Sequence, residues 1–249
     1  MEEPNAHIFL KPDFIEKKDV TTTMPKINEE KCNYCGDCGE ICTYKALAVI
    51  KNKILFFSEL CHGCLGCYFV CKQEAVEKEK KLIGIIEKGH FKNIYGQNSI
   101  FLHGKLNVGE PMAVSIISST KNLIIDNKDV IIDAPPGTSC PVIESVKGSD
   151  FCLLVTEPTP FGLHDLKLMV EVVKKLNKPS GLVVNRSDMG NKEVWKYCKL
   201  EDIPILMEIP MDKKIAIAYS KGIPIVHEIP EYIPKFQKLL NKIKELIRN

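Results

Sequence analysis

The sequence predicts an α/β protein that combines a parallel-sheet domain with a compact, cysteine-rich unit. Eight of the eleven cysteines fall in two copies of one spacing within residues 32–71. From about residue 82, apolar runs rich in β-branched residues alternate with helical patterns, which is typical of a parallel sheet. The 249 residues leave roughly 170 for this second core, which is an ordinary domain size.

The cysteine spacing is C-x2-C-x2-C-x3-C in both copies. This spacing is typical of a bacterial ferredoxin with two 4Fe-4S clusters, in which the fourth cysteine of each repeat ligates the cluster of the other repeat. The first predicted cluster is therefore held by Cys32, Cys35, Cys38 and Cys71. The second is held by Cys61, Cys64, Cys67 and Cys42.

Zinc and disulfide bonds are the alternatives for so many cysteines. Zinc prefers separated C-x2-C pairs that close a tetrahedron, which fits three cysteines at successive three-residue steps poorly. Cysteines two residues apart make strained disulfides, and nothing at the N-terminus resembles a secretory signal. Pro commonly follows the fourth cysteine of a ferredoxin repeat, whereas Thr43 and Lys72 stand there. The ligand set is unaffected by that departure.

The cysteine-rich region is also an internal repeat, because residues 31–47 align with residues 60–76 at a period of 29. Between the copies, residues 48–50 and 54–56 flank Lys51, Asn52 and Lys53 and predict a hairpin. We therefore expect a ferredoxin-like α+β unit over residues 26–80. Residues 1–25 and 81–249 are assigned to the α/β domain.

Outside this unit, strands and helices are expected in alternation. Apolar residues at helical spacing predict one helix over residues 162–176 and an amphipathic closing helix over residues 234–247. The expected strands are 129–133, 151–156, 180–185 and 203–206. The hydrophobic residues of these elements are expected to form the core.

Motifs at the strand ends carry a resemblance to a known family. Residues 133–139 read DAPPGTS, and residues 157–162, 185–188, 209–212 and 218–222 follow later strands in the same order as in that family. The chain resembles the MinD, Mrp and nitrogenase-iron-protein class of P-loop ATPases, and most closely the subgroup of MinD-like ATPases with an inserted ferredoxin domain. The resemblance covers nearly the whole chain.

The resemblance implies nucleotide-binding roles at matching positions. Asp133 would hold a magnesium ion through water, and Gly137 would give the following switch loop its mobile backbone. Asn185 would hydrogen-bond the adenine edge, with Pro210 and Asp212 beside the purine. The ordinary alternative is that a strand-ending Asp or Asn caps the next helix or makes a turn.

The family pattern fails at the phosphate-binding loop, because no segment reads G-x-x-x-x-G-K-[ST]. The implied MinD-like domain is therefore expected to be N-terminally incomplete, with the edges of neighbouring strands exposed. ATP and Mg²⁺ are doubtful cofactors of this chain. ATP hydrolysis is expected only if an upstream segment or a partner chain supplies the loop.

Three cysteines lie outside the repeats. Cys140 follows Asp133 by seven residues and resembles the switch-linked cluster cysteine of the nitrogenase iron protein. That resemblance would imply a homodimer bridged by a cluster, while the alternative is a small residue at a helix start. Core packing is expected for Cys152 and Cys198.

Composition excludes several function classes. Hydrophobic content is 45%, charged content 27% and formal net charge +2, with lysines and acids interspersed, so nucleic acid is not an expected partner. No apolar run approaches the 18 or more residues of a membrane span. Thiolate-bound clusters in a chain without a signal peptide predict a reducing cytoplasm.

Two functions follow from these patterns. In the first, two 4Fe-4S clusters pass electrons to or from a redox partner protein. In the alternative, the chain is a scaffold or carrier of Mrp-like type that hands iron-sulfur clusters on. The complete four-thiolate sets favour the first interpretation, because transfer usually requires an exposed and incompletely ligated cluster.

Overall fold

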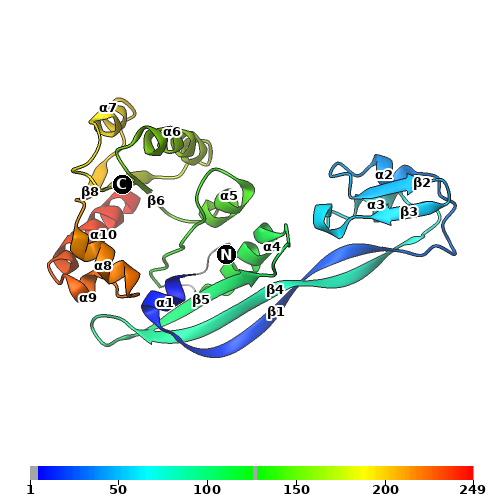
Figure 1. Ribbon diagram of the computed structural model, residues 1–249, viewed down its shortest axis with the longest axis horizontal. Helices are drawn as coiled ribbons and strands as arrows, with labels where there is room; N and C mark the ends of the chain where they lie inside the picture. The colour runs from blue at the N-terminus through cyan, green and yellow to red at the C-terminus, as the bar shows by residue number, and fades with distance from the viewer. Residues whose placement is uncertain (1–4, 126–127, 249) are drawn as a thin grey trace. The chain divides into compact units, whose positions relative to one another are not determined.

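The structure is a computed structural model that describes residues 5–125 and 128–248 (Figure 1). Its internal contacts group the chain into two units. The first contains Pro12–Phe91 and Asn98–Val130, and the second contains Asn5–Lys11, Lys92–Gln97 and the residues from Ile131 onward. Residues 1–4 of the N-terminal segment expected over 1–25 lie outside the described residues.

The first unit contains a three-stranded sheet of order β1-β4-β5. Its strands are β1 (Asp13–Ile27), β4 (Val76–Lys92) and β5 (Asn98–Leu106), and β1 pairs antiparallel with β4 from Asp13↔His90 to Ile27↔Val76. Helix α4 (Ala113–Lys121) packs on this sheet through Ile116, which shares a buried cluster with Val20, Ile83 and Ile86. A Cβ at Gly84 or Gly104 would collide with the Ile116 side chain. Glycine at both positions therefore lets α4 lie close to the strands.

The cysteine-rich segment lies between β1 and β4. It contains α2 (Asp37–Glu40), β2 (Leu47–Ile50), β3 (Lys53–Phe56), the 3-10 helix η1 (Ser58–Leu60) and α3 (Gly66–Val70). Strands β2 and β3 form the expected hairpin, with Ile50 opposite Lys53. Because β1 and β4 run through residues 25 and 80, the boundaries assigned from the sequence fall inside paired strands.

The second unit is α/β with a parallel sheet of order β6-β7-β8. Its strands are β6 (Cys152–Thr156), β7 (Ser180–Asn185) and β8 (Ile205–Ile209). Its helices are α1 (Ala6–Leu10), α5 (Cys140–Val146), α6 (Pro160–Lys175), α7 (Glu193–Leu200), α8 (Lys213–Ser220), α9 (Ile225–Glu228) and α10 (Tyr232–Arg248). The strands expected near 151–156, 180–185 and 203–206 and the helices expected near 162–176 and 234–247 are therefore confirmed.

The core of this unit lies on both faces of β7. Leu182 and Val184 are completely buried in a cluster with Leu154, Leu166 and Val170, whereas Val183 packs with residues of α10 on the other side. Helix α6 begins at a proline, and the Thr159 hydroxyl accepts a hydrogen bond from the Gly162 N–H at 3.0 Å. Proline in the first turn and a threonine N-cap are strong helix-start signals.

The strand expected over residues 129–133 does not form. This segment has no regular secondary structure, and Ile131 is 93% exposed. A strand needs a neighbour that takes up its backbone hydrogen bonds, and no described segment pairs with this one.

No helix among the described residues combines the length and apolar character of a membrane crossing.

Candidate metal centres

Two hollows in the cysteine-rich segment are each lined by four cysteines. Pocket 1 is lined by Cys32, Cys35 and Cys38 of the first repeat and by Cys71 of the second. Pocket 2 is lined by Cys61, Cys64 and Cys67 of the second repeat and by Cys42 of the first. Their volumes are about 350 and 360 Å³, including space open to solvent. This is the grouping that the crossed ligand pattern requires.

The two pockets share one backbone geometry at an offset of 29 residues. Around pocket 1, the N–H groups of Tyr34 and Ala75 donate to the sulfurs of Cys32 and Cys71, both at 3.3 Å. The equivalent bonds around pocket 2 run from Gly63 to Cys61 at 3.5 Å and from Ala46 to Cys42 at 3.2 Å. Each pocket thus has backbone donors at two of its four sulfurs, at equivalent positions of the repeat.

The loops turn around the pockets by means of left-handed backbone positions. Tyr34 and Gly36 have positive φ in the first loop, and the equivalent Gly63 and Leu65 have positive φ in the second. Each loop thus has one glycine and one larger residue at these two positions, and the glycine comes second in the first loop and first in the second loop. A left-handed leucine costs about 1 kcal/mol, so the cysteine geometry of the second loop is held against a local penalty.

Burial separates the ligands within each pocket. Cys38, Cys61 and Cys67 are buried, while Cys35 and Cys64 are exposed. Burial raises the pKa of the Cys38 and Cys61 thiols and raises that of Cys67 to about 11. Thiols of this kind keep their protons until a cation replaces them, so metal binding here is coupled to proton release.

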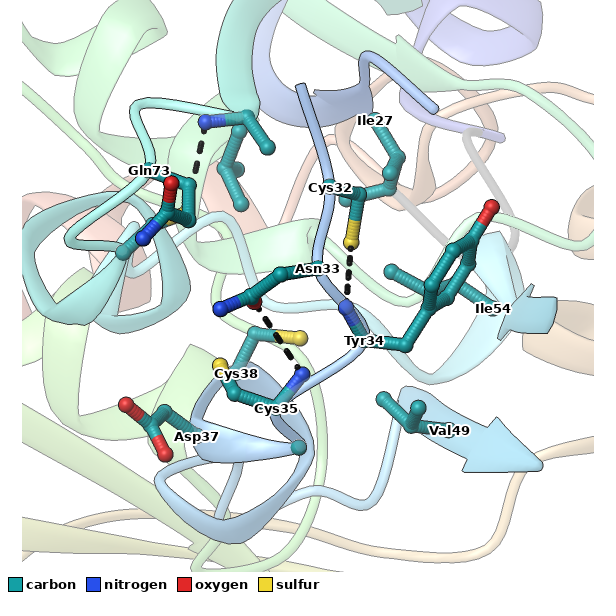
Figure 2. A pocket seen from close by; sticks show the side chains of 14 residues that line it. Ile27, Cys32, Asn33, Tyr34, Cys35, Asp37, Cys38, Val49, Ile54 and Gln73 are labelled. Atoms are coloured by element: carbon teal, nitrogen blue, oxygen red, sulfur yellow. Dashed lines mark hydrogen bonds between the residues drawn. The ribbon is translucent and has the colours of Figure 1, made fainter. Parts of the chain in front are cut away.

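The donor set fits an iron-sulfur cluster. Four cysteine sulfurs around one hollow are the ligands of a 4Fe-4S cluster, in which each thiolate binds a different iron. Among the described residues, no three His, Cys, Asp or Glu side chains surround a single ion position. Figure 2 shows Cys32, Cys35 and Cys38 around pocket 1 with Val49 and Ile54 nearby.

The walls of the two pockets differ in polarity. Pocket 1 is lined by Asn33, Asp37 and Gln73, in addition to its apolar residues. Pocket 2 is instead lined by Ile41, Leu65, Tyr44 and His62, and the last two rings stack with centroids 3.7 Å apart. At equivalent positions, pocket 1 has Asp37 and pocket 2 has Gly66. The sequence analysis missed this contrast between the two walls, although aligning the repeats brings out the exchange of Asp for Gly.

The carboxyl ends of the parallel strands contain three of the proposed nucleotide-binding residues. Asn185 ends β7, while Pro210 and Asp212 follow β8. The Asp212 carboxylate accepts a hydrogen bond from the Lys214 N–H at 2.8 Å and so caps α8. Asp133 and Gly137 lie in the exposed, irregular segment before α5. Asp212 thus caps a helix, and the nucleotide-binding roles of these residues stay predictions.

Neighbouring residues join these strand ends. Asp188 accepts a hydrogen bond from the Met211 N–H at 2.6 Å, and the Arg186 guanidinium lies 3.3 Å from the Glu157 carboxylate. Gly190 has positive φ, and a Cβ there would collide with the Pro158 carbonyl. The sequence analysis missed these contacts, although the position of Asp188 within the motif 185–188 was a signal.

Several proteins are similar to this chain in sequence. The uncharacterized protein MJ0579 of Methanocaldococcus jannaschii is 32% identical over 237 residues, which cover 94% of this chain and 77% of that protein. The uncharacterized protein MJ0578 of the same organism is 29% identical, over 99% of this chain and 84% of its own length. An iron-sulfur cluster carrier protein of Pyrococcus horikoshii is 33% identical over 138 residues, covering 47% of this chain and 46% of that protein.

The chain belongs to the MinD-like P-loop ATPase family. Among solved structures, the cell division ATPase MinD of Pyrococcus furiosus is 29% identical over 52% of this chain and 57% of its own, with a TM-score of 0.44. No family model matches the sequence.

Within this MinD-like chain, the remaining cysteines fall into two environments. Cys140 is exposed at the first residue of α5. Cys152 and Cys198 are buried in the core of the parallel-sheet unit, as expected. Burial raises the pKa of both thiols, that of Cys198 to about 11. These two cysteines act as small apolar core residues.

Proposed function

We propose that this MinD-like protein is an iron-sulfur protein that binds one 4Fe-4S cluster in each four-cysteine pocket. The observation that carries the proposal is the grouping of the eight cysteines into two complete sets, each with three from one repeat and one from the other. Backbone N–H groups also donate hydrogen bonds to four of the sulfurs, and hydrogen bonds to ligand sulfurs are among the features that tune iron-sulfur clusters.

Cluster delivery is the first candidate for what the protein does. Several relatives are named iron-sulfur cluster carrier proteins, and this favours the carrier interpretation over electron transfer. The exposed Cys35 and Cys64 give each pocket a ligand that incoming thiols can reach. In such a delivery the cluster is cargo. Four iron-cysteine bonds break while four bonds to acceptor thiolates form, and the protons released by the acceptor pass to the donor cysteines without oxidation or reduction.

Electron transfer is the second candidate, and the pocket geometry favours it. Each cysteine set is complete, and Cys38 of pocket 1 packs in the same buried cluster as Cys67 of pocket 2. Two clusters held so near one another exchange electrons readily, and the partner would be a redox protein. In either case, the chain's own residues hold the thiolates, exclude water from the buried ligands and donate N–H groups to sulfur. ATP hydrolysis is not proposed, because the sequence contains no G-x-x-x-x-G-K-[ST] motif.

One anaerobic experiment separates the candidates. The reconstituted protein is mixed with an apo form of a 4Fe-4S enzyme, with and without an iron chelator, and the acceptor's activity is followed. A carrier restores activity at a rate that the chelator does not suppress, because the cluster passes directly. An electron carrier keeps its iron, undergoes reversible reduction and leaves the acceptor inactive. Protein that binds no iron after reconstitution would exclude both functions.

A further inference from the structure

The two pockets have the same ligand geometry but different surroundings, because the structural equivalence between the two repeats stops at residue 24 of β1. Residues 24–27 of β1 correspond to β3 (Lys53–Phe56) of the other half. Before residue 24, β1 continues back to Asp13 and pairs with β4. Before Lys53, the chain instead makes the exposed turn at Lys51 and Asn52. Both pockets are lined by residues of the long strands, but the stretch of β1 before residue 24 has no counterpart in the other half.

The ligand loop of pocket 2 packs against this additional stretch of β1. A Cβ at Gly63, in the loop between Cys61 and Cys64, would lie 2.9 Å from the Thr23 carbonyl oxygen and 3.1 Å from the Thr22 hydroxyl. It would also lie 3.8 Å from the end of the Met112 side chain. Met24, which is buried, packs in one cluster with Cys61. The ligand loop of pocket 2 is thus held against β1.

Pocket 1 is lined by Ile27 of β1 and Val76 of β4, but it has no counterpart of the contact that Thr22 and Thr23 make at Gly63. The residue equivalent to Gly63 is Tyr34, and the segment equivalent to Thr22 and Thr23 is the exposed turn at Lys51 and Asn52. Cys38 is the one buried ligand of pocket 1, whereas Cys61 and Cys67 are both buried in pocket 2. The polar wall residues Asn33, Asp37 and Gln73 also favour water near the pocket 1 ligands.

We infer that pocket 1 is the exchange site, from which a cluster leaves or at which it arrives, while pocket 2 retains its cluster. Replacing a cysteine ligand requires an incoming thiolate to reach the iron, or a proton to reach the iron-bound sulfur that leaves. Cys35 and Cys64 are both exposed, but approach to the remaining ligands is freer at pocket 1 than at pocket 2, where Cys61 is also buried and β1 lies against the ligand loop. The inference rests on the proposed binding of two clusters, and it assigns the exchange of cargo to one of them. The exchange is the ligand replacement described above, with no change in electron count.

Matched variants that keep one pocket each test this inference. Cys35→Ala with Cys71→Ala removes two ligands of pocket 1, and the repeat-equivalent Cys64→Ala with Cys42→Ala removes two ligands of pocket 2. Iron release to a chelator is measured anaerobically for the full-length protein and both variants. We expect two phases of similar amplitude in the parent protein, with the fast phase missing from the variant that lacks pocket 1. A single phase in the parent with equal rates in the variants, or a fast phase that disappears with pocket 2, would overturn the inference.

A milder substitution tests the role of β1 without removing a ligand. Gly63→Ala places a methyl group against Thr23 and should make release from pocket 2 several-fold faster, leaving pocket 1 unchanged. Gly96→Ala is the control, because Gly96 also has positive φ but no atom within 4 Å of the added methyl group. An unchanged slow phase in Gly63→Ala would contradict the inference. Total iron bound before release is a separate reading, and its absence would refute the proposed function instead.

Discussion

The cysteine pockets and the strand ends of the parallel sheet both resemble cofactor sites, but they differ in how many of the predicted residues the folded chain brings together. All eight cysteines come from one segment of 40 residues, and local turns bring them into two complete sets. Asn185, Pro210 and Asp212 end or follow adjacent strands, whereas Asp133 and Gly137 lie in an exposed segment that forms no strand. A site built by one segment depends on local geometry, whereas a site assembled from several strands depends on the whole sheet.

The largest effect is expected from double cysteine variants, which distinguish the loss of two ligands from one pocket from the loss of two ligands from one repeat. Cys35→Ala with Cys71→Ala affects one pocket from both repeats and should lower iron from about eight to about four per chain. Cys35→Ala with Cys42→Ala affects one repeat and both pockets, so it should remove nearly all bound iron. Iron and acid-labile sulfide analysis measures both. The opposite ranking would mean that each repeat binds its own cluster.

A core substitution in the parallel-sheet unit should change stability without changing metal content. Leu182 is completely buried between strands and helices, so Leu182→Ala should lower the free energy of unfolding of this unit by about 3 kcal/mol. Denaturant unfolding can be followed by the fluorescence of Trp195, the single tryptophan of the chain. Val155→Ala, at a mostly exposed position of β6, is the control and should cost less than about 0.5 kcal/mol. Loss of iron in Leu182→Ala would show that the cysteine pockets depend on the sheet.

The Asp37 carboxylate should separate the reduction potentials of the two clusters. A negative charge disfavours the added electron, so Asp37→Asn should raise the potential of the pocket 1 cluster by on the order of 50 mV, equivalent to about 1 kcal/mol. Electron paramagnetic resonance during a redox titration measures the shift. Glu40→Gln removes an acid from the same helix that does not line the pocket, and it should have a smaller effect. Equal shifts in the two variants would assign the effect to overall charge.

A smaller effect is expected at an ion pair of the first unit. The Glu87 carboxylate accepts hydrogen bonds from Lys105 and His103, both at 2.8 Å, and these bonds lower its pKa below the usual 4.5. Its stabilisation is therefore complete above about pH 4.5 and is lost as the pH falls through the lower pKa of the folded protein.

Glu87→Gln should cost about 1 kcal/mol at neutral pH and flatten this acid dependence. Chemical denaturation at several pH values checks both effects, and Glu16→Gln on exposed β1 is the control. An unchanged acid dependence in Glu87→Gln would assign it to other carboxyl groups.

The sequence predicted most of the cysteine-rich segment because its information is local. The 29-residue repeat and the hairpin between β2 and β3 both follow from short patterns. The sequence did not predict that β1 and β4 extend from the cysteine-rich segment to Asp13 and Lys92, because their pairing joins residues far apart in the chain. The strand expected at 129–133 was wrong for a related reason, since an apolar run becomes a strand only where a neighbour accepts its hydrogen bonds.

The central claim is that each pocket binds one 4Fe-4S cluster, and metal analysis of anaerobically purified protein tests it most directly. Iron, zinc and sulfide are measured, and electron paramagnetic resonance spectra are recorded before and after dithionite. The account predicts about eight iron and eight sulfide per chain, with a reduced-state signal from two interacting clusters. Zinc in place of iron, or iron without sulfide, would contradict it.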